Sequence, residues 1–89
     1  MKARTNAGKE VELELYKFDS CPYCQKVMRV VERLKVPVAM RDILADDASA
    51  RRLVEVGGDD QVPCLFIDGA PLYESDDINA YLEKNFGRK

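Results

Sequence analysis

The chain has 89 residues, enough for one domain with a modest core and too few for two. Apolar residues make up 46% of it and charged residues 34%, which is typical of a globular protein and excludes a disordered or fibrous class. The net charge of −2 argues against a nucleic-acid partner, because such binding depends on neutralising phosphates.

No apolar run approaches the ~20 residues that a membrane-spanning helix needs, and residues 1–10 lack the apolar core of a secretion signal. We therefore expect a cytoplasmic protein with no membrane partner. In a reducing compartment, a Cys-x-x-Cys pair indicates redox chemistry or metal binding and not a structural disulfide.

The first part of the chain predicts a tail, a strand and a helix. Residues 1–10 contain Gly, Asn and charges without periodicity, which predicts a flexible tail before a domain of residues 11–89. Residues 11–18 alternate between apolar and polar, which predicts a strand with one buried face. Pro22 suits the first turn of a helix, and the apolar residues after it recur at helical spacing.

The middle of the chain predicts a second strand and a second helix. Val36-Pro37 ends the first helix, and residues 38–43 form the next strand. Asp46, Asp47 and Ser49 are typical helix-start residues, and Gly57-Gly58 ends the short amphipathic helix that follows them.

The last part predicts a hairpin and a third helix. Residues 63–67 are an apolar run, Asp68-Gly69 is a turn signal, and residues 70–73 return as the second strand of the hairpin. The helix begins with Ser75 or Asp76 as its cap. The whole order, β-α-β-α-β-β-α, predicts an α/β fold with a mixed four-stranded sheet and helices on both faces.

Cys21-Pro22-Tyr23-Cys24 carries the chemistry, because it lies where the first strand gives way to a helix. The unpaired N–H groups and the positive end of the helix dipole favour a thiolate on Cys21, the nucleophilic form. Cys24 falls one turn inside the helix, where we expect it to be less exposed and able to attack a mixed disulfide on Cys21.

Other interpretations of this pair stay open. A closed zinc site needs four ligands, whereas the chain has three cysteines and no histidine, so we predict no metal site. An iron–sulfur cluster shared between two subunits and an inert pair are the remaining alternatives. Cys64 lies in an apolar run and is predicted to be a small core residue, with a third redox position as its alternative.

Three segments resemble known families. The Cys-Pro-Tyr-Cys tetrapeptide resembles that of two-cysteine glutaredoxins, and Gln61-Val62-Pro63 is similar to a Val-Pro segment of glutaredoxins and of glutathione-transferase amino-terminal domains. Residues 73–78 resemble the glutathione-carboxylate motif of both families. Where glutaredoxins have two glycines before this motif, the chain has Tyr73-Glu74.

The resemblance implies a thioredoxin-like (glutaredoxin) fold with a cis Val62-Pro63 bond. It also implies that glutathione binds at Pro63 and the main chain of Val62, the amides of Ser75 and Asp76 and the Asp76 side chain, while Tyr23 is expected to touch the substrate. Glutathione is then a co-substrate, with no permanently bound cofactor.

The implied activity is reduction of protein disulfides and glutathione mixed disulfides by a monomer, with Cys21 as nucleophile and Cys24 as resolving thiol. Its partners are glutathione and disulfide-containing or glutathionylated proteins. A non-catalytic glutathione-binding module and an iron–sulfur carrier remain the alternative functions.

Overall fold

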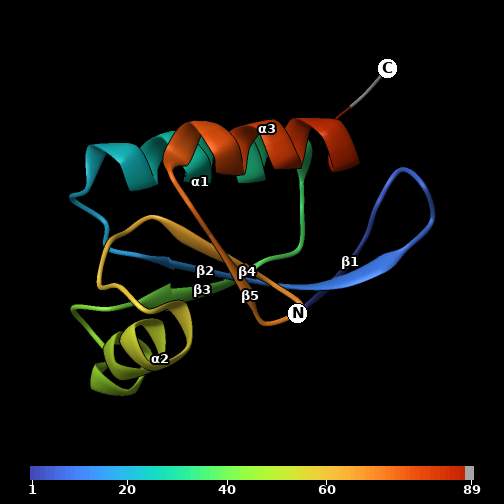
Figure 1. Ribbon diagram of the computed structural model, residues 1–89. Helices are drawn as coiled ribbons and strands as arrows, with labels where there is room; N and C mark the ends of the chain where they lie inside the picture. The colour runs from blue at the N-terminus through green and yellow to red at the C-terminus, as the bar shows by residue number, and fades with distance from the viewer. Residues whose placement is uncertain (88–89) are drawn as a thin grey trace.

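The computed structural model describes residues 1–87, and Figure 1 shows a sheet with helices on both sides. The elements in chain order are β1 (Lys2–Arg4), β2 (Glu10–Lys17), α1 (Pro22–Leu34), β3 (Ala39–Asp42), α2 (Asp47–Gly57), β4 (Cys64–Ile67), β5 (Ala70–Tyr73) and α3 (Ser75–Phe86). None of these helices is long and apolar enough to cross a membrane. From β2 onward, the order is the predicted one.

The sheet is built around β2. This strand pairs in parallel with β3 and antiparallel with β4, and β4 pairs antiparallel with β5. The first pair is parallel because α1 carries the chain back across the sheet before β3 begins. Leu15 lies opposite Leu65 and Tyr16 opposite Cys64. The predicted mixed sheet is confirmed.

β1 is a strand that the sequence analysis missed. Lys2–Arg4 pairs antiparallel with the start of β2, so the sheet has five strands and the expected flexible tail is wrong for these residues. Ala3 is buried in the main core, and Leu13 donates a backbone hydrogen bond to the Met1 carbonyl over 3.0 Å. Gly8, at φ 87°, lies in the turn that lets the chain fold back.

The alternate side chains of β2 separate two cores. Leu13 and Leu15 are fully buried in the larger cluster, with residues of α1 and α3. Tyr16, on the opposite face, belongs to a smaller cluster with Leu53 of α2 and Phe66 of β4. Figure 1 shows α1 and α3 on one side of the sheet and α2 on the other. The prediction of one buried face is therefore incomplete, since β2 is buried on both.

The helix starts agree with the sequence except at α3. Cys21 is the N-cap of α1, and Asp46 caps α2 by accepting a hydrogen bond from the Ala48 amide. The N-cap of α3 is Glu74, at φ 71° and ψ 120°, so the predicted cap at Ser75 or Asp76 is wrong. Tyr73 still belongs to β5, which leaves a single residue to turn the chain into the helix.

Replacing Leu15 with alanine should test the importance of the central strand. The side chain is fully buried, so its truncation should lower the free energy of unfolding by about 2–5 kcal/mol. Leu44, which is 73% exposed, is the matched control, and its replacement with alanine should change stability by less than about 0.5 kcal/mol. Urea unfolding followed by circular dichroism measures both, and equal losses would contradict this account of the core.

Candidate active site

Cys21 lies at the point where a strand ends and a helix begins. β2 ends at Lys17, and Pro22 is the first residue of α1, where its missing N–H costs no hydrogen bond. Cys21 has an extended backbone, and its Sγ accepts a hydrogen bond from the Cys24 amide at 3.3 Å. The Cys21 sulfur therefore receives one of the N–H groups that a helix start leaves unpaired.

Cys24 occupies a different environment. Its side chain is fully buried, whereas Cys21 is 7% exposed. Burial raises the pKa of the Cys24 thiol to about 12, with a further contribution from the hydrogen bond with Cys21. All three cysteines are free thiols in this structure. Cys24 thus stays protonated near neutral pH, in the deeper position that the sequence predicted.

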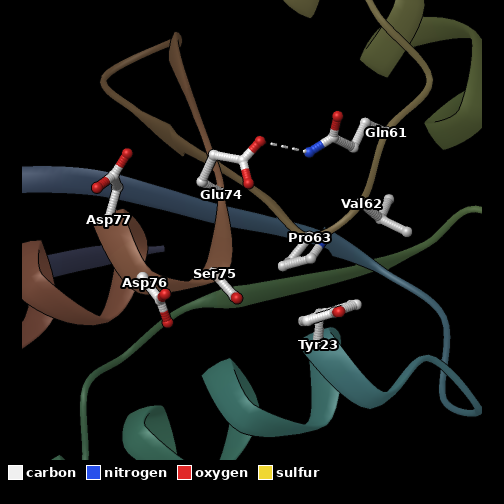
Figure 2. Close-up of a pocket in the computed structure, with 8 residues that line it drawn as sticks. All are labelled: Tyr23, Gln61, Val62, Pro63, Glu74, Ser75, Asp76 and Asp77. Carbon is white, nitrogen blue, oxygen red and sulfur yellow. Dashed lines mark hydrogen bonds between the residues drawn. The ribbon is translucent and has the colours of Figure 1, made fainter.

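A pocket of about 670 Å³ opens beside the start of α1 (Figure 2). It is formed by the first turn of α1, the loop before β4 and the start of α3. It brings together all five residues predicted for glutathione, together with Gln61, Glu74 and Asp77. Its lining is Tyr23, Gln61, Val62, Pro63, Glu74, Ser75, Asp76 and Asp77.

The loop before β4 contributes the main chain of Val62 to this pocket. The Val62-Pro63 bond is cis, as predicted. Cys64, which follows it, begins β4 and is fully buried in the smaller core cluster, so its predicted core position is confirmed. Among the described residues, the N–H and C=O of Val62 make no hydrogen bond, which leaves this stretch of backbone available to a ligand.

The start of α3 forms the other side of the pocket. Ser75 is buried, and Figure 2 shows its hydroxyl turned toward Tyr23. Gln61 donates a side-chain hydrogen bond to the Glu74 carboxylate over 3.1 Å, joining the loop before β4 to α3. Sequence reasoning named neither Gln61 nor Glu74 as a site residue, although both lie within the segments that carry the resemblance.

Charges around the site are largely paired. Lys17 is mostly buried and contacts Asp19 at 2.6 Å and Asp42 at 3.7 Å, and the hydrogen bond with Asp19 raises the pKa of Lys17. The carboxylate of Asp76 at the pocket rim lies 3.6 Å from Lys26. Within residues 1–87, no three potential ligand side chains are grouped as a metal site would require.

The family described as "Glutathione S-transferase, N-terminal domain" matches residues 15–89. The chain belongs to this family. The match includes every residue of the pocket and both cysteines of the tetrapeptide. It also agrees with the resemblance seen in the sequence, which joined glutaredoxin and transferase features.

Among curated proteins, the chain is 37% identical to Glutaredoxin 2 of Escherichia coli K12 over 78 residues. The match covers 85% of this chain and 35% of that protein, so the chain spans about a third of the length of this relative. This relative is a glutaredoxin, whereas the family that matches the chain is a glutathione-transferase domain. Together the two findings agree with motifs that resemble both families.

Solved structures confirm the thioredoxin-like fold. An epsilon-class glutathione S-transferase from the housefly Musca domestica has a TM-score of 0.74 at 24% identity, covering 88% of this chain and 37% of the transferase. A glutathione transferase homologue from Drosophila mojavensis, solved with bound glutathione, has a TM-score of 0.76 at 22% identity, covering 89% and 37%. A thioredoxin-like protein has a TM-score of 0.70 at 23% identity, covering 80% and 99%.

Alkylation should distinguish the three thiols. At neutral pH, iodoacetamide should modify Cys21 first, because its sulfur faces a helix start. Cys24 and Cys64 are fully buried, and burial raises their pKa values to about 12 and about 11. Mass spectrometry of peptides after timed labelling measures the order. An adduct that forms first on Cys24 would reverse the assigned roles.

Proposed function

We propose that the chain is a glutathione-dependent thiol–disulfide oxidoreductase that reduces protein disulfides and glutathione mixed disulfides. The observation that carries this proposal is a dithiol at a helix start, next to a pocket whose lining matches the implied glutathione residues. The proposed protein acts in the cytoplasm as a monomer, with glutathione as co-substrate and no permanently bound cofactor.

The reaction uses the two cysteines in sequence. The Cys21 thiolate attacks one sulfur of a substrate disulfide, forms a mixed disulfide and releases the other sulfur as a thiolate, which takes up a proton. Either Cys24 then attacks the Cys21 sulfur and releases the second substrate thiol, or, when that group is glutathione, a glutathione thiolate attacks the glutathione sulfur, forms glutathione disulfide and releases Cys21 as a thiolate. When Cys24 attacks, the dithiol loses two electrons to the substrate and becomes a disulfide.

The state of Cys21 changes the environment of Cys24 during this sequence. In the dithiol, the interaction with Cys21 adds to the burial that raises the pKa of Cys24. Once Cys21 is in a mixed disulfide, its sulfur carries no charge, and only burial opposes ionisation of Cys24. The resolving thiol thus becomes a better nucleophile after the first step, when it is needed.

Glutathione fits the pocket through groups on both sides. The unpaired N–H and C=O of Val62 are placed to pair with the cysteinyl backbone of glutathione, as an added strand would. The amides of Ser75 and Asp76 at the start of α3 suit the γ-glutamyl carboxylate, and the Asp76 side chain suits its amino group. Tyr23 is 61% exposed at the rim, where it can cover the bound peptide.

A non-catalytic glutathione-binding module is the second candidate. It is favoured by the family match and by the pocket residues Glu74-Ser75, which stand where the resemblance places the Glu-Ser pair of glutathione transferases. This function would give glutathione binding without turnover in a disulfide-reduction assay, whereas the proposed oxidoreductase gives both.

The cysteine variants test the proposed mechanism. Cys24→Ser should keep activity on glutathione mixed disulfides, because a second glutathione can clear Cys21. It should lose most activity on protein disulfides, because intramolecular attack by Cys24 is the fast release of an attached protein. Cys21→Ser should abolish both activities. Glutathione-coupled reduction assays on the two substrate types measure this, and equal failure of both variants on glutathionylated substrates would contradict the division of roles.

Ser75→Ala should test glutathione binding separately from thiol chemistry. Loss of a buried hydroxyl that faces a charged ligand should raise the KM for glutathione about tenfold or more, with kcat little changed. Ser20→Ala is the matched control, because Ser20 is exposed and does not line the pocket. Steady-state kinetics over a range of glutathione concentrations gives both constants. An unchanged KM in Ser75→Ala would remove the Ser75 hydroxyl from the site and leave only its amide as a candidate contact.

A further inference from the structure

The hydroxyl of Tyr16 is buried on the α2 side of the sheet without a partner. The residue is fully buried, and its ring packs against the Phe66 ring at a tilt of 40°, with the ring centroids 4.5 Å apart. Its Oη makes no hydrogen bond among the described residues. Because most buried polar groups are paired, an unpaired hydroxyl that lines a cavity indicates a missing partner.

That cavity is a second pocket of about 320 Å³, which shares no residue with the pocket beside the cysteines. β2, β3 and the first turns of α2 form it, so residues far apart in the sequence meet there. Its lining is Glu14, Tyr16, Arg41, Asp46, Ala48, Ser49 and Arg52.

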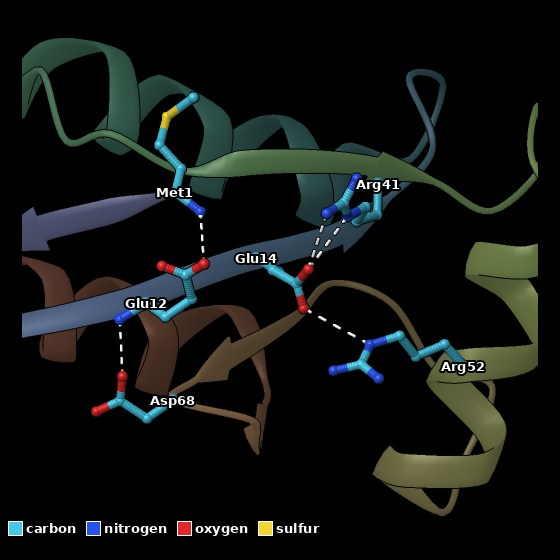
Figure 3. Close-up of polar contacts among 6 residues, drawn as sticks. All are labelled: Met1, Glu12, Glu14, Arg41, Arg52 and Asp68. Carbon is cyan, nitrogen blue, oxygen red and sulfur yellow. Dashed lines mark hydrogen bonds and ion pairs between the residues drawn. The ribbon is translucent and has the colours of Figure 1, made fainter.

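Two guanidinium groups approach one carboxylate at this pocket (Figure 3). Arg41 from β3 binds Oε2 of Glu14, with its Nη2 at 2.9 Å, and Arg52 from α2 lies 3.7 Å from Oε1. Both oxygens of Glu14 are therefore engaged, and the Asp46 carboxylate is engaged by the Ala48 amide and the Ser49 hydroxyl. The carboxylates of the pocket therefore already have donors bound to them.

Hydrogen-bond donors in this pocket, in contrast, are not all paired with acceptors of the protein. In the described part of the chain, the Arg52 guanidinium makes a long ionic contact with Glu14 and lies over the Phe66 ring, 5.7 Å from the centroid. Its planar group carries five N–H donors. Burial raises the pKa of Tyr16, and the nearby Glu14 adds to this, so the hydroxyl keeps its proton. Arg52 lies near enough to this hydroxyl to lower its pKa, in the opposite direction, but the geometry between the two groups is not that of a formed hydrogen bond.

We propose that this pocket binds a small oxyanion, a phosphate or carboxylate group, with the Tyr16 hydroxyl at its base and the free N–H groups of Arg52 at its mouth. The two carboxylates already bind donors of the protein, and the two arginines offset their charge. The forked guanidinium geometry matches two oxygens of one anion. This site is independent of the thiol chemistry, because it uses none of the residues assigned to glutathione.

The test is a titration of the ¹⁵N-labelled chain with inorganic phosphate and, separately, with acetate, at constant ionic strength set by chloride. Saturable shifts of the Ala48 and Ser49 amides and of the Arg52 Nε–H resonance are expected with at least one of the two anions. Saturation with phosphate alone assigns a tetrahedral ligand, and saturation with acetate alone assigns a carboxylate.

Two variants and one control make the result specific. Tyr16→Phe and Arg52→Gln should each weaken binding about tenfold or more, because each removes a hydrogen bond to a charged ligand. Arg51→Gln, which removes the same charge from an exposed neighbour on α2 outside the pocket, should leave the affinity within about twofold.

Thermal unfolding in chloride buffer checks that Tyr16→Phe still folds. The lost hydroxyl has no partner, so the variant should be at least as stable as the original chain without anion. Shifts that do not saturate with either anion, equal weakening in Arg51→Gln and Arg52→Gln, or unchanged affinity in Tyr16→Phe would each overturn the proposal and leave an ordered water as the partner of Tyr16.

Discussion

The register between β2 and β4 is the constraint on which the candidate site depends. Tyr16 lies opposite Cys64, so the last residues of β2 and the first residues of β4 lie side by side at the same end of the sheet. Just beyond that end of the sheet, the loop after β2 leads to Cys21, and Val62-Pro63 comes directly before β4. A slip of one residue would turn Leu13 and Leu15 out of the larger core, so the burial of these leucines holds the register. The packing of the core therefore fixes the register, and the register places the residues of the candidate site next to one another.

Burial on both faces of β2 also explains why the two thiols differ. The layer of α1 and α3 needs apolar side chains from α1, and Cys24 lies on the buried side of that helix together with Val27 and Val31. Cys21 precedes the first turn and is held by the backbone geometry of the helix start instead. Helix α1 therefore supplies an N–H group to the Cys21 sulfur and buries the Cys24 sulfur away from water. Their chemical asymmetry follows from their positions in the fold.

Sequence reasoning worked where a local pattern has one physical meaning. The alternation in β2, Pro22 at the start of α1 and the Asp68-Gly69 turn each depend on neighbours in the chain. It failed where the deciding partner is distant. β1 offers only Ala3 as an apolar residue, and its pairing with β2 could not be read from three residues. The pocket at Tyr16 joins residues 14, 41 and 52, whose meeting depends on the register of β3 and the docking of α2.

Glu74 shows how the pocket keeps its shape without the glycines that glutaredoxins have there. A non-glycine residue at φ 71° costs about 1–3 kcal/mol, which a glycine would avoid. Glycine, however, would supply no side chain to accept the hydrogen bond from Gln61, which connects the loop before β4 to the start of α3. A single exposed hydrogen bond contributes about 0.5–1.5 kcal/mol, so it offsets only part of the cost. Stability alone thus does not account for Glu74. Its carboxylate also lines the pocket, together with the Asp76 side chain that is proposed to face the amino group of a γ-glutamyl ligand, so Glu74 adds negative charge to that part of the site.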